Sequence, residues 1–230
     1  MKIKGCKLYL NGGYVRDKLL SIKPKDKDYT VITKMSFPNL VKEVEKVGEI
    51  FQTKTEFLTI RAKIDGEVVD LVLARSEDDY TDGRHPNKVV RVNNLEDDSK
   101  RRDFTINAMY LDNEGEVVDF HNGRDDLKRK IIRCVGVPEE RFKEDYLRIL
   151  RAVRFALRFE FGIEMHTLDA MLHYSNGLKN ISSDRIREEL NKCLIYNPQE
   201  TIFYIHLLKL WDILKDKGLT FNLSNKKVKQ

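Results

Sequence analysis

Two aspartates one residue apart are the first candidates for chemistry in this sequence. Asp26 and Asp28 stand in the segment PKDKDYTV, at the mouth of an alternating β-type run. Alternate side chains of a strand point to the same face, so the two carboxylates are expected to lie together. Adjacent carboxylates repel each other, and a bound divalent cation such as Mg²⁺ is the ordinary remedy. Asp70, in the β-type segment VVDLVLAR, is a candidate third carboxylate. A charged loop is the alternative interpretation of an Asp-x-Asp pattern taken alone.

A glycine pair precedes these aspartates. Gly12 and Gly13 separate the β-type run KLYLN from the amphipathic segment YVRDKLL, which predicts a strand, a sharp turn and a helix. A glycine turn lets backbone amides approach an anion closely, and the positive end of the helix attracts a triphosphate. Arg16, one turn into the helix, could reach the same phosphates or a ribose. Joined to the acidic strand, this pattern predicts a site for a metal and a triphosphate.

The elements that must position these groups differ along the chain. Residues 1–135 mix short β-type runs with helices, which predicts an α/β head. Segments with helical spacing fill 136–217, which predicts an all-α neck, and 218–230 is expected to be a flexible basic tail. Hairpin turns are expected at Asp65-Gly66 and at 112–115. The expected strands are 7–11, 28–33, 58–64, 67–74, 108–111 and 116–120, and the expected helices are 14–20, 138–159, 165–178, 182–195 and 198–214.

Composition bounds the class of protein. The 230 residues suffice for one large or two small domains. Lys and Arg number 42 against 37 Asp and Glu, so the net charge of +5 permits a local basic patch for RNA rather than a uniformly basic surface. Three dispersed cysteines suggest neither a disulfide framework nor a zinc site. With no apolar run near the ~20 residues of a membrane span and no signal peptide, a cytoplasmic protein is expected.

Four motifs, in order along the chain, resemble those of one family. They are GGYVRDKLL with KDKDYTV, then RRDFTINAM, DFHNGRDDL and EDYLRILRAVRF. They are similar to motifs of the class II tRNA nucleotidyltransferases, or CCA-adding enzymes, and of the closely similar bacterial poly(A) polymerases. The resemblance covers about residues 7–200, which in the family are the catalytic head and the helical neck. The body and tail domains that normally follow are not expected in this chain.

The resemblance also implies a fold and a set of site residues. It implies a head of the nucleotidyltransferase superfamily typified by DNA polymerase beta, with Asp26 and Asp28 as ligands of Mg²⁺. Asp70, the candidate third carboxylate, is expected to be catalytic as well. The polar stretch 75–94, with Tyr80, Asp82, Arg84, His85 and Pro86, looks like the flexible loop that the family needs to switch from C to A addition. The implied nucleotide-binding residues are Gly12, Gly13, Arg16, Arg102, Asp103, Asn107, Glu144, Asp145, Arg148, Arg151 and Arg154.

Hydrogen-bond polarity supplies a reason for base choice. Residues 145, 148, 151 and 154 recur every third position of an expected helix and would form a slanted polar stripe. Cytosine and adenine present an amine donor beside a ring-nitrogen acceptor, whereas guanine and uracil present the reverse. A carboxylate at Asp145 and a guanidinium at Arg148 match only the first pattern, and a mismatch leaves charged groups unpaired.

The sequence as a whole indicates an enzyme that acts on RNA ends. The expected reaction is template-independent addition of C, C and A, from CTP and ATP, to the 3′ end of tRNA, with release of pyrophosphate. One alternative is a polymerase that adds only A, either as poly(A) or as the terminal A of tRNA. A second alternative is a non-catalytic RNA-binding relative. The sequence leaves the oligomeric state open.

Overall fold

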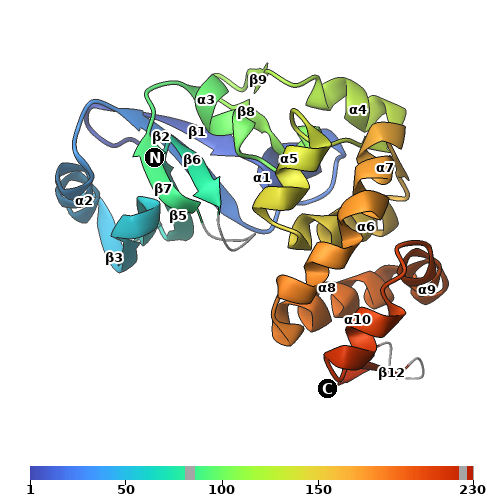
Figure 1. Ribbon diagram of the computed structural model, residues 1–230. Coiled ribbons are helices and arrows are strands. Elements are labelled where there is room, and N and C mark those ends of the chain that lie inside the picture. The colour runs from blue at the N-terminus through green and yellow to red at the C-terminus, as the bar shows by residue number, and fades with distance from the viewer. Residues whose placement is uncertain (81–85, 223–226, 230) are drawn as a thin grey trace. The chain divides into compact units, whose positions relative to one another are not determined.

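The computed structural model describes residues 1–80, 86–222 and 227–229. These residues form two compact units, one of residues 1–78 with 88–127 and another formed mainly by residues 128–230. The first unit carries most of the strands and the second carries the longest helices (Figure 1). In neither unit is any described helix both long enough and apolar enough to cross a membrane.

A seven-stranded mixed sheet forms the centre of the first unit. Its strands are β1 (Cys6–Asn11), β2 (Lys27–Thr33), β3 (Gly48–Lys54), β4 (Thr59–Ile64), β5 (Glu67–Leu73), β8 (Met109–Leu111) and β9 (Val117–Asp119). The strand order is β3-β4-β5-β2-β1-β8-β9. Only β2 and β5 pair in parallel, and the other neighbouring strands of this sheet pair antiparallel. Both expected hairpins are confirmed.

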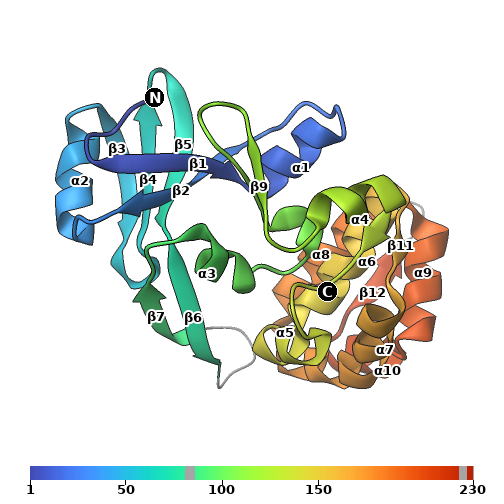
Figure 2. The ribbon, with the colours of Figure 1, turned by 90° about the horizontal axis from the view of Figure 1, so that it is seen from above.

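The two faces of this sheet differ in polarity. Helix α2 (Phe37–Glu45) covers one face and lies alongside β3 in Figure 2. Alternate residues of the strands pack there into an apolar cluster, and burying each large side chain stabilises the unit by about 1.5–3 kcal/mol. The cluster includes Leu8, Val31, Phe37, Leu40, Val44 and Leu71. The intervening residues, among them Asn11, Asp28, Thr30 and Asp70, therefore belong to the other, polar face.

Short helices connect or follow these strands. They are α1 (Gly13–Leu19), the 3-10 turn η1 (Thr55–Phe57), α3 (Leu95–Lys100), the 3-10 turn η2 (Thr105–Asn107) and α4 (Gly123–Arg129). Asn94 caps α3, because its side chain accepts a hydrogen bond of 2.8 Å from the backbone N–H of Asp97. Glycine is required at Gly123, where a Cβ would lie 2.3 Å from the carbonyl oxygen of Thr105.

The prediction of a loop over residues 75–94 is wrong for most of this range. Residues Arg75–Tyr80 and Pro86–Arg91 form strands β6 and β7 of a separate two-stranded sheet. Long polar side chains anchor these strands. The strands therefore lack the alternating apolar residues that would predict them from sequence. Arg75 donates to the Phe57 carbonyl and Arg91 to the Thr33 and Met35 carbonyls. Residues Asp82, Arg84 and His85 of the loop motif lie outside the described residues.

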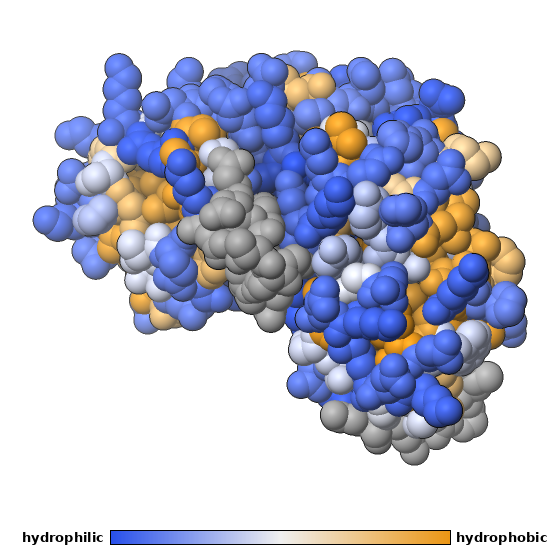
Figure 3. Space-filling model, in the orientation of Figure 1, coloured by the Kyte–Doolittle hydropathy of each residue, from blue (hydrophilic) through white to orange (hydrophobic). Residues whose placement is uncertain are grey.

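The second unit is largely helical. Its elements are β10 (Ile131–Ile132), α5 (Pro138–Glu144), α6 (Leu147–Phe159), β11 (Gly162–Ile163), α7 (Met165–Tyr174), the 3-10 helix η3 (Ser175–Asn180), α8 (Ser183–Tyr196), α9 (Pro198–Leu207), α10 (Trp211–Asp216), β12 (Thr220–Asn222) and β13 (Lys227–Lys229). Helices α6 and α8 pack together through buried side chains that include Leu150, Val153, Leu190 and Cys193. Burial raises the pKa of the Cys193 thiol to about 12. Part of the surface of this unit is apolar, as Figure 3 shows.

Three expectations for this unit are corrected by the structure. The helix expected over 138–159 is interrupted, because Asp145 takes an extended conformation between α5 and α6. The helix expected over 198–214 is interrupted at Lys209, whose φ of 55° is left-handed. The tail expected to be flexible is paired at its described residues, with β12 antiparallel to β13. The Phe221 ring lies 5.7 Å from the Trp211 ring and anchors β12.

Candidate active site

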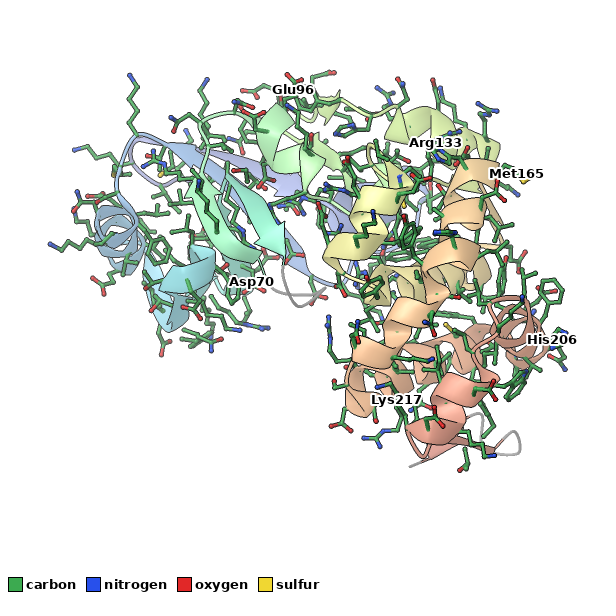
Figure 4. The ribbon with its side chains drawn as sticks, in the orientation of Figure 1. Asp70, Glu96, Arg133, Met165, His206 and Lys217 are labelled. Carbon is green, nitrogen blue, oxygen red and sulfur yellow. The ribbon has the colours of Figure 1, made fainter. Side chains whose placement is uncertain are left out.

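The acidic residues meet where the central strands β2 and β5 begin to pair. We call this region, formed by Asp26, Asp28 and Asp70, the acidic edge. Asp28 and Asp70 are directly paired in the parallel register of these strands. Asp26 precedes β2 by one residue. A cavity of about 590 Å³ opens here. Asp70, which belongs to β5, is labelled in Figure 4. The cavity is lined by Lys25, Asp26, Lys27, Asp28, Arg61, Glu67, Val68, Val69 and Asp70. All three carboxylates that the sequence singled out therefore line one cavity.

Electrostatics at this edge disfavour the ionised form of Asp28. Burial, followed by the charges of Asp70 and Asp26, raises the pKa of the Asp28 carboxyl above its ordinary value. Arg102 and Arg61 act in the opposite direction without cancelling this effect. The Arg61 Nε atom lies 3.8 Å from Asp70 Oδ1, so Asp70 has a cation of its own. A bound cation would stabilise the ionised form of Asp28, which its surroundings otherwise oppose.

The donor set fits a hard divalent cation bound together with a ligand. Carboxylate oxygens are the ligands that Mg²⁺ prefers, and Mg²⁺ is usually held by one or two carboxylates and by phosphate oxygens. Among the residues that the structure describes, no three acidic, histidine or cysteine side chains gather closely enough to hold one metal ion. A cation here would therefore be held by fewer than three of these side chains, and phosphate oxygens and water would complete its coordination.

The glycine turn is present, and its geometry explains the residue type. Gly12 has a φ of 59°, and a Cβ there would lie 3.7 Å from both Arg102 Nη1 and the Asn107 carbonyl oxygen. Its N–H donates to the Met109 carbonyl at 3.2 Å, so this amide is committed to the sheet. Helix α1, which follows from Gly13, has only seven residues. The turn brings the backbone close to Arg102, while the role expected for the Gly12 amide itself is not supported.

Arg16, Asp103 and Asn107 form one buried network. Each side chain belongs to a residue that is more than nine-tenths buried. Arg16 Nη1 donates to Asn107 Oδ1 at 2.5 Å, and its Nη2 lies 2.6 Å from Asp17 Oδ1. Asn107 Nδ2 donates to Asp103 Oδ1 at 3.0 Å. The three residues, which were expected to bind nucleotide, brace α1 against η2.

Arg102 lies on the polar face of the sheet, between two strands and α3. Its Nη1 donates to Asn11 Oδ1 at 3.1 Å, and its Nη2 donates to Thr30 Oγ1 at 3.2 Å and to Asp98 Oδ2 at 3.0 Å. Its positive charge lowers the pKa of the Asp28 carboxyl, although burial and Asp70 outweigh this effect. Arg102 is thus the basic residue of the predicted set that acts electrostatically on the acidic edge.

Asp98 is the site residue that the sequence analysis missed. It is completely buried, and it accepts hydrogen bonds from the Tyr110 hydroxyl at 2.8 Å and from the Arg75 backbone N–H at 3.1 Å. A signal was available, because Asp98 stands four residues before Arg102, and acidic and basic residues at that spacing on a helix meet. The dense charge of LEDDSKRRD concealed which of its acids is buried.

In the second unit, the break between α5 and α6 sets the positions of the predicted base-reading residues. Asp145 Oδ1 accepts at 3.0 Å from the N–H of Leu147, the first residue of α6, and its Oδ2 lies 3.6 Å from Arg185. Arg148 Nη1 donates to Glu144 Oε2 at 2.6 Å and to the Arg141 carbonyl at 3.0 Å. Glu144, Asp145 and Arg148 are therefore neighbours, although Asp145 is not on the helix that was expected to carry it.

Arg151 and Arg154 continue along α6. Both guanidinium groups lie over the Phe155 ring, at 5.6 and 4.2 Å from its centre. Arg154 Nε donates to Glu189 Oε2 of α8 at 2.7 Å. Burial opposes ionisation of Glu189, but Arg154 and Lys192 hold the pKa of its carboxyl below the ordinary value. Arg154 therefore joins two helices of this unit.

Comparison with known families now places the chain. The Poly A polymerase head domain matches residues 8–133, and the probable RNA and SrmB-binding site of polymerase A matches residues 160–209. The first match covers more than half of the 230 residues. It contains the acidic edge, the glycine turn and Arg102. The chain belongs to the family defined by this head domain, and its α/β head followed by a helical region is the architecture expected from the sequence.

Individual relatives agree with this assignment. A CCA-adding enzyme of Lactobacillus helveticus is 42% identical over 88% of this chain, which corresponds to 50% of the relative. One of Oceanobacillus iheyensis is 42% identical over 82% of this chain and 46% of the relative. The chain thus spans about half the length of these curated relatives.

Solved structures give the same result at the level of the fold. The Bacillus stearothermophilus CCA-adding enzyme in complex with CTP is 31% identical, with a TM-score of 0.76 over 89% of this chain and 48% of the other. The Thermotoga maritima CCA-adding enzyme complexed with tRNA_CCA is 28% identical, with a TM-score of 0.75 over 96% of this chain and 51% of the other.

Proposed function

We propose that this chain adds C, C and A to the 3′ end of tRNA, using CTP and ATP and releasing pyrophosphate. The observation that carries the proposal is the in-register pairing of Asp28 with Asp70 beside a cavity, within the field of Arg102. The names of the relatives support the choice of reaction, and the complexes of related structures with CTP, ATP and tRNA support the choice of substrates.

Mg²⁺ is the proposed metal, and Asp26 and Asp28 are the proposed ligands, with Asp70 beside them. When bound, the ion would lower the pKa of the terminal 3′-hydroxyl and offset charge on the phosphates. The contribution of the chain is to hold the two carboxylates on one side of the sheet edge. Strand pairing fixes Asp28 before any ligand arrives, so little rearrangement is needed on binding.

The remaining residues are proposed to orient the nucleotide. Arg102 would attract the triphosphate to the cavity, because its positive field already extends to Asp28. Arg16, Asp103 and Asn107 would keep the glycine turn in place through their buried network. In the second unit, Asp145 and Arg148 are proposed to select cytosine and adenine by hydrogen-bond polarity, and Arg151 and Arg154 to act on all nucleotides alike.

Incorporation of labelled nucleotides tests this function directly. Each of the four nucleoside triphosphates would be offered with Mg²⁺ and a tRNA lacking its CCA end. The proposal expects two C and one A to be added, with negligible U and G, and no addition by Asp26→Ala or Asp28→Ala. An unstructured RNA offered in parallel separates tRNA-directed addition from general tailing.

A second candidate function is addition of A alone. It is favoured by the family to which the head belongs, which is described as a poly A polymerase head. Incorporation of ATP without CTP into both tRNA and unstructured RNA would support it. Retention of tRNA binding without any incorporation would instead indicate a non-catalytic relative. A cytoplasmic location is proposed with the tRNA substrate and rests on that assignment.

A further inference from the structure

We infer that Asp98 and Tyr110 are positioning residues that hold the Arg102 guanidinium at the proposed nucleotide site. The inference rests on the proposed function, in which Arg102 attracts the triphosphate. Neither residue belongs to the set implied by the sequence motifs. Their role is argued from a network of buried hydrogen bonds that converges on one carboxylate.

The Asp98 carboxylate is fixed at both of its oxygens. Oδ2 accepts from Arg102 at 3.0 Å and from the Tyr110 hydroxyl at 2.8 Å. Oδ1 accepts from Arg101 at 2.9 and 3.0 Å and from the Arg75 backbone N–H at 3.1 Å. These donors come from β6, β8 and the end of α3. A fully buried carboxylate held from three segments cannot turn without breaking several hydrogen bonds.

Arg102 is held in turn by its surroundings. Asn11 on β1 and Thr30 on β2 accept from its two terminal nitrogens at 3.1 and 3.2 Å. Its Cζ atom lies 5.6 Å from the centre of the Tyr110 ring. An arginine side chain is long and mobile in water, so an anion that binds it ordinarily has to restrict that motion. Here the restriction is present before binding.

The network leaves Arg102 able to attract an anion. Burial opposes ionisation of Asp98, but Arg102 and Arg101 hold the pKa of its carboxyl far below the ordinary range, so the anchor stays charged. That one charge is shared between two guanidinium groups and a phenol. Burial also raises the pKa of Tyr110, so its hydroxyl remains a donor at neutral pH. Asp98 thus orients Arg102 without fully neutralising it.

The test compares two tyrosine-to-phenylalanine variants of the full chain. Tyr110→Phe removes one donor to Asp98 and keeps the ring. Tyr29→Phe is the matched control, because Tyr29 lies on the α2 face of the same sheet and has no hydrogen-bond partner for its hydroxyl among the described side chains. Calorimetry with CTP and with ATP gives Kd, steady-state assays on tRNA lacking CCA give KM and kcat, and thermal denaturation gives Tm.

The expected result is a change in affinity rather than in folding. Tyr110→Phe should raise Kd and KM for both nucleotides about tenfold, with kcat at saturation changed by less than about twofold. Tyr29→Phe should match the wild type. Asp98→Asn, if it folds, should raise Kd by about a hundredfold, since it removes a charged anchor.

Two outcomes overturn the inference. If Tyr110→Phe binds both nucleotides as the wild type does, Arg102 is not positioned by this network, whatever happens to Asp98→Asn. If affinity falls in both tyrosine variants in proportion to Tm, the effect is general destabilisation. A wild-type protein that binds neither nucleotide would overturn the proposed function itself, whereas a wild type that adds CCA beside an unaffected Tyr110→Phe would overturn only the positioning role.

Discussion

At the scale of single residues, the stability of the fold and the binding of a cation favour opposite protonation states of Asp28. Its carboxyl is partly buried beside the charges of Asp70 and Asp26, and its pKa is raised. A raised carboxyl pKa means that folding favours the protonated form, so stability is lost as the pH rises above the ordinary value of 3.8, and the loss is complete above the raised pKa. Yet the ionised carboxylate is the form that can bind a cation. The fold therefore accepts a stability cost at the residue on which the proposed chemistry depends.

This conflict predicts that Asp28→Asn is less active but more stable than the wild type. Asp28→Asn should lower nucleotide transfer by about a hundredfold or more, because a lost metal contact costs several kcal/mol. It should also raise Tm at neutral pH, because the repulsion and the cost of burying a charge disappear. That advantage should shrink as the pH falls through the raised pKa and vanish below the ordinary carboxyl value of 3.8, where the wild-type group is protonated in both states. Thermal denaturation in EDTA across this range measures it.

The matched control for that experiment is Asp169→Asn, which alters an exposed carboxyl on α7. It should leave both Tm and transfer unchanged. If Asp28→Asn were less stable than the wild type at neutral pH, the carboxylate would be making favourable contacts that outweigh its burial.

Asp145 permits a second residue-level experiment on base choice. Asn at position 145 keeps an oxygen that can accept from the Leu147 N–H, so the start of α6 keeps this hydrogen bond. It also introduces an amide donor, which changes the polarity proposed to select C and A. We expect Asp145→Asn to reduce incorporation of C and A about tenfold to a hundredfold and to relax exclusion of G and U.

Steady-state kinetics with each of the four nucleotides would check the effect of Asp145→Asn. Asp145→Ala, which also loses the hydrogen bond to the Leu147 N–H, separates lost polarity from a disturbed helix start. An unchanged preference in Asp145→Asn would show that another residue selects the base.

The acidic residues of the site could be predicted from sequence, whereas its anchors could not. Asp26 and Asp28 follow from strand alternation, which is a local rule, and Asp70 follows from its place in a β-type segment beside a hairpin turn. Asp98 depends on which of several charged residues turns inward, and that is decided by where Tyr110 and the Arg75 backbone lie after folding. Asn11 and Thr30 carry no charge and no motif, so only the register of β1 with β2 brings them to Arg102.

At the scale of helices, one buried ion pair joins α6 to α8. The Arg154 and Glu189 side chains are 12% and 7% exposed, so removing one partner leaves a poorly solvated charge. Glu189→Ala is expected to lower the free energy of unfolding by about 3–5 kcal/mol. Chemical denaturation at pH 7 measures the change.

An exposed ion pair on the same helix provides the comparison. Asp184 pairs with Arg187 at the start of α8, and its side chain is 75% exposed. Asp184→Ala should cost less than about 1 kcal/mol. Equal losses in Asp184→Ala and Glu189→Ala would mean that burial does not govern the strength of these pairs.

Sequence patterns predicted the existence of the helices better than their interruptions. Apolar spacing continues through 138–159, yet the chain bends at Asp145 because the side chain hydrogen-bonds to the backbone two residues later. The hairpin of β6 and β7 was hidden for a similar reason. Its anchors are arginines that donate to distant carbonyls, and such partners are decided by tertiary structure.

At the scale of the whole molecule, a net charge of +5 suggests that attraction to RNA is strong only at low salt. Neutralising phosphates with Lys and Arg releases counterions, so affinity for tRNA should fall steeply as salt rises. Between about 50 and 200 mM salt, we expect Kd for tRNA to rise tenfold or more. Fluorescence anisotropy measures this, with a neutral solute of matched osmolarity as the control. A Kd that is insensitive to salt would indicate recognition dominated by uncharged contacts.

The parallel pairing of β2 with β5 has a consequence for the newly made protein. Parallel neighbours cannot be joined by a tight turn, and here the crossover consists of α2, β3 and β4. Asp28 and Asp70 therefore meet only after this whole crossover has folded, and contacts so distant in sequence form late. A chain still emerging from the ribosome would carry both aspartates but no acidic edge. Competence for chemistry would thus depend on completion of this crossover.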